Sequence, residues 1–284
     1  MNRFLATLAV VLVSGCAATG VKAPTAPAAN DNLNAVLWTQ TSPEHAMIYR
    51  EVYRQATDAL GAALADPSWD ALAADDRPEG SDPRDLPPAV VLDIDETVLD
   101  NSPYQARLIH DHASYDDATW ADWVREKAAR PLPGALAFTR AAAARGIAVI
   151  YLSNRDHALD QATLANLKAE GFPVSGPDAF LGLGAEVPGC RQEGTSKSCR
   201  RRLVAGKYRV LVQVGDQVGD FIELPAAGPA ERRAALKPYR DWIGTRWFVL
   251  PNPTYGGWES APFHDHWSLD ADARRAAKLK ALRY

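Results

Sequence analysis

Short apolar segments alternate with helical segments between residues 89 and 250. The apolar segments are four to seven residues long and rich in β-branched residues, which is typical of strands buried inside a parallel sheet. They comprise residues 89–92, 147–152, 179–183, 208–214 and 246–250. Helices are expected at 135–145 and 157–170, because each of these segments ends directly before a glycine that can close a helix. The alternation predicts a Rossmann-like α/β fold, with a mostly parallel central sheet and helices on both faces.

Residues 33–64 precede the first strand and have a helical pattern. Ser42-Pro43-Glu44 offers an N-cap, a proline suited to the first helical position and an acid for the first turn. We expect one or two helices there, which pack on the sheet or form a small helical lobe. Residues 66–88 are dense in Asp, Pro and Gly and are expected to form a loop. The predicted division is an N-terminal helical segment with its loop at 33–88 and a core at 89–284, which ends in a basic, Ala-rich helix at 271–282.

The first 32 residues have the pattern of a targeting segment followed by a tether. After a short positive start, the apolar run at 4–13 is too short to span a bilayer as a helix. Val13-Ser14-Gly15-Cys16 resembles a bacterial lipobox, so we expect a signal peptide at 1–15, lipidation of Cys16 and a lipidated tether at 16–32. The alternative is an ordinary secretory signal with an incidental cysteine. The first interpretation predicts a bacterial outer-membrane lipoprotein whose domain lies in the periplasm or at the cell surface.

The overall composition excludes few classes of function. Of the 284 residues, 47% are hydrophobic and 23% are charged, and the formal net charge is −4. These values are ordinary for a globular protein. Because the chain has no long basic run, a nucleic acid polymer is not expected as its main partner. The short basic cluster at 197–202 is of a kind that usually lies on a solvated face.

Polar side chains follow three of the predicted strands at the point where each strand ends. They are Asp93 and Asp95, Ser153-Asn154-Arg155, and Gly215-Asp216 with Asp220. Open α/β sheets bind their ligands at the carboxyl ends of the strands, so these groups are expected to meet. Two neighbouring buried acids repel each other, and a bound cation would relieve the repulsion. One acid could then act as a nucleophile while the other transfers protons. Taken alone, the D-x-D pattern is equally compatible with a surface turn.

Aromatic residues offer candidates for stacking against an organic group of a substrate. They are Tyr104, Trp120, Trp123 and Tyr255. The alternative for each of them is packing inside the protein, where tryptophan is commonly found.

Two further features leave alternatives open. His110-Asp111-His112 and His264-Asp265-His266 could each contribute to a different metallohydrolase centre, but neither pair comes with further His or Cys at ligand spacing. Cys190 and Cys199 could form a disulfide in an oxidising compartment, although the sequence does not fix their geometry.

Taken together, the motifs resemble the haloacid dehalogenase (HAD) superfamily of phosphohydrolases, and within it the class C acid phosphatases, the lipoprotein e(P4) type of 5′-nucleotidase. The matching segments are Ile94 to Asn101 with Tyr104, Ser153-Asn154-Arg155, Lys197 with Arg200-Arg201, Gly215-Asp216 to Asp220-Phe221, and Leu250 to Pro253 with Tyr255-Gly256 and Trp258. The chain departs from the family pattern at Gln217-Val218, where Asn or Thr and then Leu are expected, and at Gly257, where Asp is more usual.

The resemblance implies hydrolysis of phosphate monoesters through an aspartyl-phosphate, with Asp93 as the nucleophile. Asp95 would protonate the leaving alcohol and then activate water, so the rate is expected to be highest at acidic pH. The implied cofactor is Mg²⁺, held by Asp93, the backbone carbonyl of Asp95 and Asp216.

The resemblance also implies that Ser153 and Lys197 hold the phosphoryl oxygens, with Asp220 and Asn154 in supporting positions. Its substrate class is small phosphomonoesters, and nucleoside monophosphates in particular. A different class of function is a nutrient-binding lipoprotein that keeps the scaffold without turnover, although the presence of every implied catalytic residue weighs against it. The oligomeric state is not encoded in any of these motifs.

Overall fold

The computed structural model describes residues 30–284 except 177, 225 and 226. Residues Asn32–Tyr284 form one compact unit, which includes both the N-terminal helical segment and the predicted core. The predicted signal peptide, Cys16 and residues 17–29 of the predicted tether lie outside the described residues. No helix in the described part of the chain is long and apolar enough to cross a membrane.

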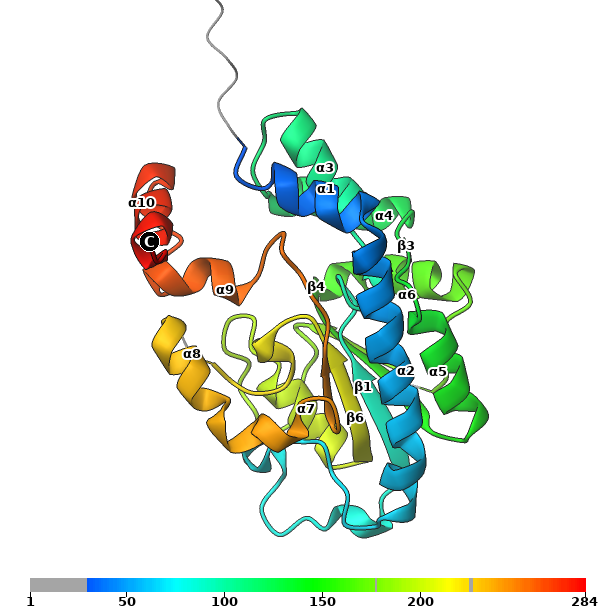
Figure 1. Cartoon of the computed structure of the whole chain (residues 1–284). Helices are drawn as coiled ribbons and strands as arrows, with labels where there is room; N and C mark the ends of the chain where they lie inside the picture. The colour runs from blue at the N-terminus through cyan, green and yellow to red at the C-terminus, as the bar shows by residue number, and fades with distance from the viewer. Residues whose placement is uncertain (1–29, 177, 225–226) are drawn as a thin grey trace, which may run out of the picture. The chain divides into compact units, whose positions relative to one another are not determined.

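A five-stranded parallel sheet forms the centre of this unit (Figure 1). Its strand order is β5-β4-β1-β6-β7. The strands are β1 (Pro88–Leu92), β4 (Ala148–Asp156), β5 (Phe180–Leu183), β6 (Arg209–Gly215) and β7 (Trp247–Val249). A separate two-stranded antiparallel sheet pairs β2 (Leu99–Asp100) with β3 (Arg130–Pro131). The predicted α/β fold with a mostly parallel sheet is therefore confirmed.

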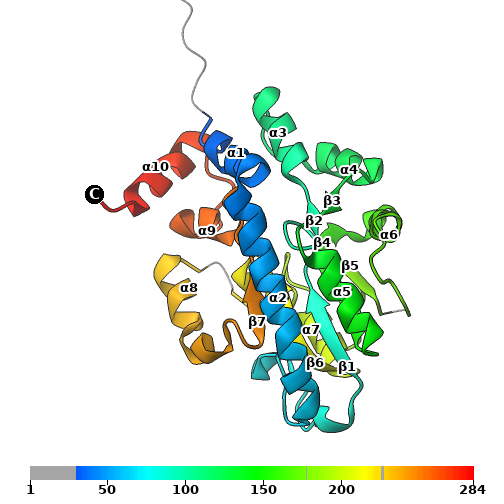
Figure 2. The same cartoon turned by 45° about the vertical axis from the view of Figure 1, so that its right-hand side comes forward.

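Helices cover both faces of the large sheet, and the alternation of side chains along β1 shows why. Val90 and Leu92 belong to one buried cluster, together with residues of α2 (Pro43–Ala65) and α5 (Ala135–Ala144). Figure 2 shows these two helices side by side. Ala89 and Val91 point to the other face, into a cluster that includes residues of α7 (Ser198–Ala205). Successive residues of a strand face opposite sides of the sheet, so each face needs its own helical cover.

Of the two arrangements expected for the N-terminal helices, α2 packs on the sheet. Its start agrees with the sequence prediction: Ser42 is the N-cap and accepts a 3.1 Å hydrogen bond from the backbone N–H of His45, and Pro43 is the first helical residue. Tyr49 and Tyr53 of α2 are buried and donate hydrogen bonds from their hydroxyls to the backbone carbonyls of Glu96 and Thr97. Helix α2 thereby supports the loop that follows β1.

Two element boundaries differ from the prediction in ways that affect the site. Strand β4 continues past residue 152 to Asp156, so Ser153, Asn154 and Arg155 lie within the strand and alternate between buried and exposed. The predicted helix at 157–170 begins with a 3₁₀ turn and becomes α6 (Asp160–Ala169). The remaining helices are α1 (Leu33–Thr41), α3 (Ser102–His110), α4 (Asp117–Glu126), α8 (Pro229–Ala235), α9 (Gly257–Ser260) and α10 (Ala271–Ala281).

Candidate active site

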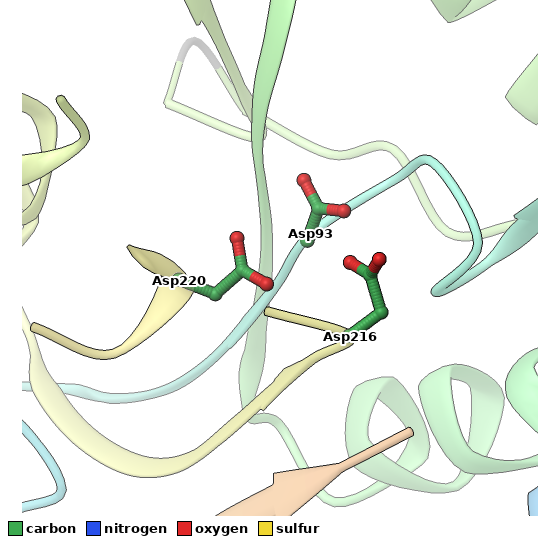
Figure 3. Close-up of side chains that lie close together, drawn as sticks. All are labelled: Asp93, Asp216 and Asp220. Carbon is green, nitrogen blue, oxygen red and sulfur yellow. The ribbon is translucent and has the colours of Figure 1, made fainter. Parts of the chain in front are cut away.

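Three carboxylates meet at the carboxyl ends of β1 and β6. Asp93 directly follows β1, Asp216 directly follows β6, and Asp220 lies in the 3₁₀ turn Val218–Asp220. One oxygen from each carboxylate lies within 4.8 Å of the others. Figure 3 shows the three side chains pointing into a common space. The parallel order of the two strands explains the meeting, because it brings both carboxyl ends to the same edge of the sheet.

Lys197 links two of these acids. Its Nζ donates hydrogen bonds to Asp93 Oδ1 and, over 2.7 Å, to Asp220 Oδ1. Lys197 and Asp93 are each less than a tenth exposed. Burial by itself would lower the pKa of Lys197, but the carboxylates of Asp220 and Asp93 outweigh it, so the net shift raises the pKa. The ammonium therefore stays charged and offsets part of the negative charge of the cluster.

The acids of the cluster carry more negative charge than Lys197 can offset. Burial raises the pKa of Asp93 to about 7, despite the opposing effect of Lys197 and with a contribution from Asp220. Burial, and then the charges of Asp220 and Asp93, raise the pKa of Asp216 as well. Both shifts show that the ionised cluster is electrostatically costly without a further cation. Carboxylate oxygens are the ligands preferred by hard divalent cations such as Mg²⁺, so the donor set fits such an ion.

Gly215 allows the close approach of Asp220 to the end of β6. A Cβ at position 215 would lie 2.3 Å from Asp220 Oδ2, which no relaxed structure tolerates. That same oxygen accepts a 2.9 Å hydrogen bond from the backbone N–H of Gln217, so the carboxylate is fixed from both sides. Both oxygens of Asp220 thus have protein donors, which favours a supporting position for this residue.

The carboxylate of Asp95 is held by hydrogen-bond donors from Arg155 and Asn101. Its Oδ1 accepts hydrogen bonds from Arg155 Nη2 at 2.7 Å and Arg155 Nε at 3.0 Å, and from Asn101 Nδ2 at 2.8 Å. Trp123 Nε1 in turn donates to Asn101 Oδ1 over 2.8 Å. Arg155 is 1% exposed, so a buried guanidinium orients the Asp95 carboxylate. The carboxylate of Asp95 is not part of the three-acid cluster.

Ser153, the second predicted phosphate-binding residue, is fully buried. It lies on β4, which pairs with β1, the strand that Asp93 directly follows. Its Oγ accepts a 3.1 Å hydrogen bond from the backbone N–H of Arg155. Arg200 donates to the backbone carbonyl of Ser153 and, over 2.6 Å, to Oδ1 of the exposed Asn154. The structure therefore ties both predicted residues to α7, the helix that begins one residue after Lys197.

Most of the basic cluster at 197–202 is buried rather than solvated, and Arg202 is its exposed cation. Arg200 and Arg201 are both fully buried. Arg201 Nε donates to Asp76 Oδ2 over 2.5 Å, and Arg201 Nη1 donates to the backbone carbonyl of Gly219 over 2.9 Å. A buried arginine with several acceptors can stay charged and hold backbone segments together. Arg200 thereby holds the end of β4 that carries Ser153, and Arg201 holds the turn that carries Asp220.

The predicted aromatic residues divide into buried and accessible ones. Tyr104 and Trp123 are each 3% exposed and pack inside the protein, whereas Trp120 and Tyr255 are only partly buried. The Tyr255 hydroxyl donates to the buried carboxylate of Glu96. Tyr115, which is not among the predicted stacking residues, is 58% exposed, and its ring centroid lies 6.4 Å from that of Trp120. Tyr115 directly precedes Asp116, the N-cap of α4, which is the helix that carries Trp120.

The structure also decides two features that the sequence left open. Cys190 and Cys199 form a disulfide, with a Cα–Cα separation of 5.6 Å. It closes the loop that contains Lys197. Among the residues that the structure describes, neither His-x-His pair joins a cluster of three or more metal-ligating side chains.

A substitution at Gly215 tests whether the close approach of Asp220 is a requirement of the fold. We expect Gly215→Ala to lower the free energy of unfolding by about 1–3 kcal/mol, the usual cost of overpacking a well-packed site. Gly219→Ala is the matched control, because a Cβ at position 219 would meet no atom within 4 Å. Urea denaturation of both variants measures the difference, and equal stability of the two would contradict the steric argument.

Comparisons with known proteins identify the family of this chain. The model of the family "HAD superfamily, subfamily IIIB (Acid phosphatase)" matches residues 16–258. The solved class C acid phosphatase from Bacillus anthracis is 29% identical, with a TM-score of 0.75; the match covers 89% of this chain and 97% of that one. A second structure of that enzyme, with tungstate bound, matches equally well.

Plant proteins are also similar to this chain. Vegetative storage protein 2 from Arabidopsis thaliana is 30% identical over 58% of this chain and 55% of its own length. Acid phosphatase 1 from Solanum lycopersicum is 28% identical over 62% of this chain and 60% of its own length. The chain thus spans somewhat more than half the length of these relatives. Since the family match covers most of its residues, the chain belongs to subfamily IIIB of the HAD superfamily, the acid phosphatases.

Proposed function

We propose that this protein is a cation-dependent acid phosphatase, which hydrolyses phosphate monoesters through an aspartyl-phosphate on Asp93. The observation that carries the proposal is the buried cluster of Asp93, Asp216 and Asp220 with Lys197 bonded to its edge. A nucleophilic carboxylate, a cation site and an ammonium for the phosphoryl oxygens are the groups that this reaction needs. The family and the solved relative support the same reaction class.

Asp93 attacks phosphorus with a carboxylate oxygen, and the bond between phosphorus and the leaving oxygen breaks. Lys197 donates a hydrogen bond to Asp93 Oδ1, and in this proposal it holds a phosphoryl oxygen together with the hydroxyl of the buried Ser153. The backbone of Asp93 is fixed for this step, because its N–H donates to the carbonyl of Val214 on β6 over 3.0 Å. A second attack, by water on the phosphorus, releases inorganic phosphate and restores the carboxylate.

Asp95 gives a proton to the leaving alcohol and later accepts one from the attacking water. Three hydrogen bonds of 3.0 Å or less converge on its Oδ1, whereas among the described residues Oδ2 accepts only a 3.3 Å contact from Arg155 Nε. Oδ2 is therefore the oxygen that carries the transferred proton. Because Arg155 and Asn101 hold the other oxygen, the proton is delivered from one defined direction.

Mg²⁺ is the proposed cofactor, with Asp93, the backbone carbonyl of Asp95 and Asp216 as its protein ligands. When bound, it neutralises the repulsion between the carboxylate nucleophile and the phosphate dianion. The buried carboxylates support an oxygen-binding ion over Zn²⁺, since no His or Cys joins the cluster in the described part of the chain.

Nucleoside monophosphates are the proposed substrates among the phosphate monoesters. Trp120, Tyr255 and the exposed Tyr115 offer ring surface on which a base can stack. Arg155 lies over the ring of Trp120, at 5.5 Å from its centroid, and connects this aromatic surface with Asp95.

The lipidation of Cys16 and the location in a bacterial outer membrane are part of the same proposal. They rest on the residues before Cys16 in the sequence. The second candidate function is a nutrient-binding lipoprotein without turnover, which would bind a phosphomonoester and release no phosphate.

Phosphate release by residues 17–284 tests the proposed reaction. We expect release from adenosine monophosphate at acidic pH that stops after chelation and returns with Mg²⁺. Asp93→Asn should lower kcat at least about 10³-fold, because removing a nucleophile abolishes the covalent route. Asp58→Asn, an exposed acid on α2, is the matched control and should behave like the wild type.

A tenth or more of the wild-type rate in Asp93→Asn would refute the assignment of the nucleophile. Nucleotide binding without release, in the wild-type protein with Mg²⁺, would favour the nutrient-binding alternative.

The substrate preference can be measured separately. Stacking of a base on an aromatic ring contributes about 1–3 kcal/mol, so kcat/KM for adenosine monophosphate should exceed that for glycerol phosphate by about tenfold or more. Tyr115→Ala, which removes an exposed ring of the proposed stacking surface, should narrow this ratio and leave kcat for glycerol phosphate close to wild type. Equal kcat/KM values for the two substrates in the wild-type protein would contradict the proposed nucleotide preference.

A further inference from the structure

The segment that follows β7 forms hydrogen bonds to Asp216 of the three-acid cluster and to Gln217, the next residue in the chain. We call residues 251–257 the closing loop; it follows β7 and ends at Gly257, the first residue of the short helix α9. Asn252 of this loop contacts Asp216, and Gly257 contacts the residue that follows Asp216 in the chain. The Trp258 indole N–H donates to the backbone carbonyl of Asn252 over 3.1 Å, which links the start of this loop to the residue that follows it.

The orientation of the Asn252 amide is fixed by its own neighbours. Its Oδ1 accepts hydrogen bonds from the backbone N–H of Thr254 at 2.9 Å and from the Thr254 hydroxyl at 2.6 Å. A third donor is the backbone N–H of Tyr255, at 3.4 Å. Since the oxygen side of the amide is engaged, the amino group is the side left for Asp216. Asn252 Nδ2 donates to Asp216 Oδ2 over 2.8 Å.

The hydrogen bond from Asn252 fixes the orientation of the Asp216 carboxylate. The carboxylate of Asp216 is buried and shares the cluster with Asp93 and Asp220. The N–H donor on Oδ2 restricts rotation of this carboxylate and leaves Oδ1 to face the cluster. Donors of this kind, which hold a metal ligand without touching the metal, commonly determine the affinity of a site.

Gln217 fastens the closing loop to the other side of the cluster. Its side-chain Oε1 accepts a 3.0 Å hydrogen bond from the backbone N–H of Gly257. Its backbone N–H donates to Asp220 Oδ2 over 2.9 Å. A Cβ at position 257 would lie 2.7 Å from Arg232 Nη1, so a side chain at this position would displace the arginine. Gln217 and Gly257 are both positions where the chain departs from the family pattern, and the structure brings them into contact.

We propose that Asn252 and Gln217 are positioning residues for the cation site, which act through Asp216 and the closing loop. Asn252 holds one oxygen of Asp216, and Gln217 holds the loop that carries Asn252. The pair sets the affinity of the cluster for a divalent cation. The inference rests on the proposed function only in taking the three-acid cluster as the cation site.

Calorimetric titration of the folded protein with Mg²⁺ measures the affinity of the cation site directly. It therefore tests the positioning role without a measurement of activity. We expect Asn252→Ala to weaken Mg²⁺ binding about 10- to 100-fold, the usual effect of removing such a donor. Gln217→Ala should weaken it in the same direction, and the double variant should show less than the sum of the two effects, because both act through one loop. Asn34→Ala, on the exposed side of α1, is the matched control.

Measurements of activity then distinguish a change in Mg²⁺ affinity from a change in the rate of phosphate release. The Mg²⁺ concentration for half-maximal phosphate release should rise in Asn252→Ala by the factor found in the titration, and kcat at saturating Mg²⁺ should fall much less. If Asn252→Ala does not fold, as judged by circular dichroism, the partly exposed Gln217→Ala carries the test.

Two outcomes distinguish this inference from the proposed function. A wild-type protein that binds Mg²⁺ and releases phosphate, beside folded variants that bind Mg²⁺ equally well, overturns the positioning role alone. A wild-type protein that neither binds Mg²⁺ nor releases phosphate overturns the proposed function and its cation site together.

Discussion

The repulsion among three buried carboxylates is the constraint on which the rest of the site depends. Asp93, Asp216 and Asp220 are held within a few ångströms of one another at the end of a parallel sheet, where burial disfavours charge. The fold maintains this costly arrangement with Lys197 between two of the acids and with a glycine that lets the third approach. Clusters of this kind persist in proteins where function requires them, and here they leave charge for a cation to neutralise.

Two buried arginines of α7 and the disulfide at its start fix the positions of the segments that form the site. Arg200 bonds to the strand end that carries Ser153, and Arg201 bonds to the turn that carries Asp220. The Cys190–Cys199 disulfide closes the loop that contains Lys197, so the ammonium enters the site from a cross-linked segment. These contacts explain how a site built from separate loops can hold a defined geometry. Each buried guanidinium has fixed acceptors, which limits the movement of the backbone it contacts.

The sequence predicts the strands and the acids well, because both follow from local patterns. An apolar run that ends in Asp93, and another that ends in Gly215 and Asp216, locate the edge where the site forms. The partners of these groups are not local, and the sequence cannot pair them. Arg155 bonds to an acid 60 positions earlier, and Arg201 bonds to one 125 positions earlier. The basic cluster at 197–202 therefore resembles a solvated face in the sequence, although Arg200 and Arg201 are buried against distant partners.

The central claim is that Asp93 forms a covalent bond to phosphorus. Acid quenching of the protein during turnover of adenosine monophosphate with Mg²⁺, followed by peptide mass analysis, measures this directly. The account predicts a phosphoryl group on the peptide that contains Asp93, absent from Asp93→Asn and from protein treated with a chelator. Turnover at the full rate with no phosphoryl group on that peptide, or with the group on another residue, would contradict it.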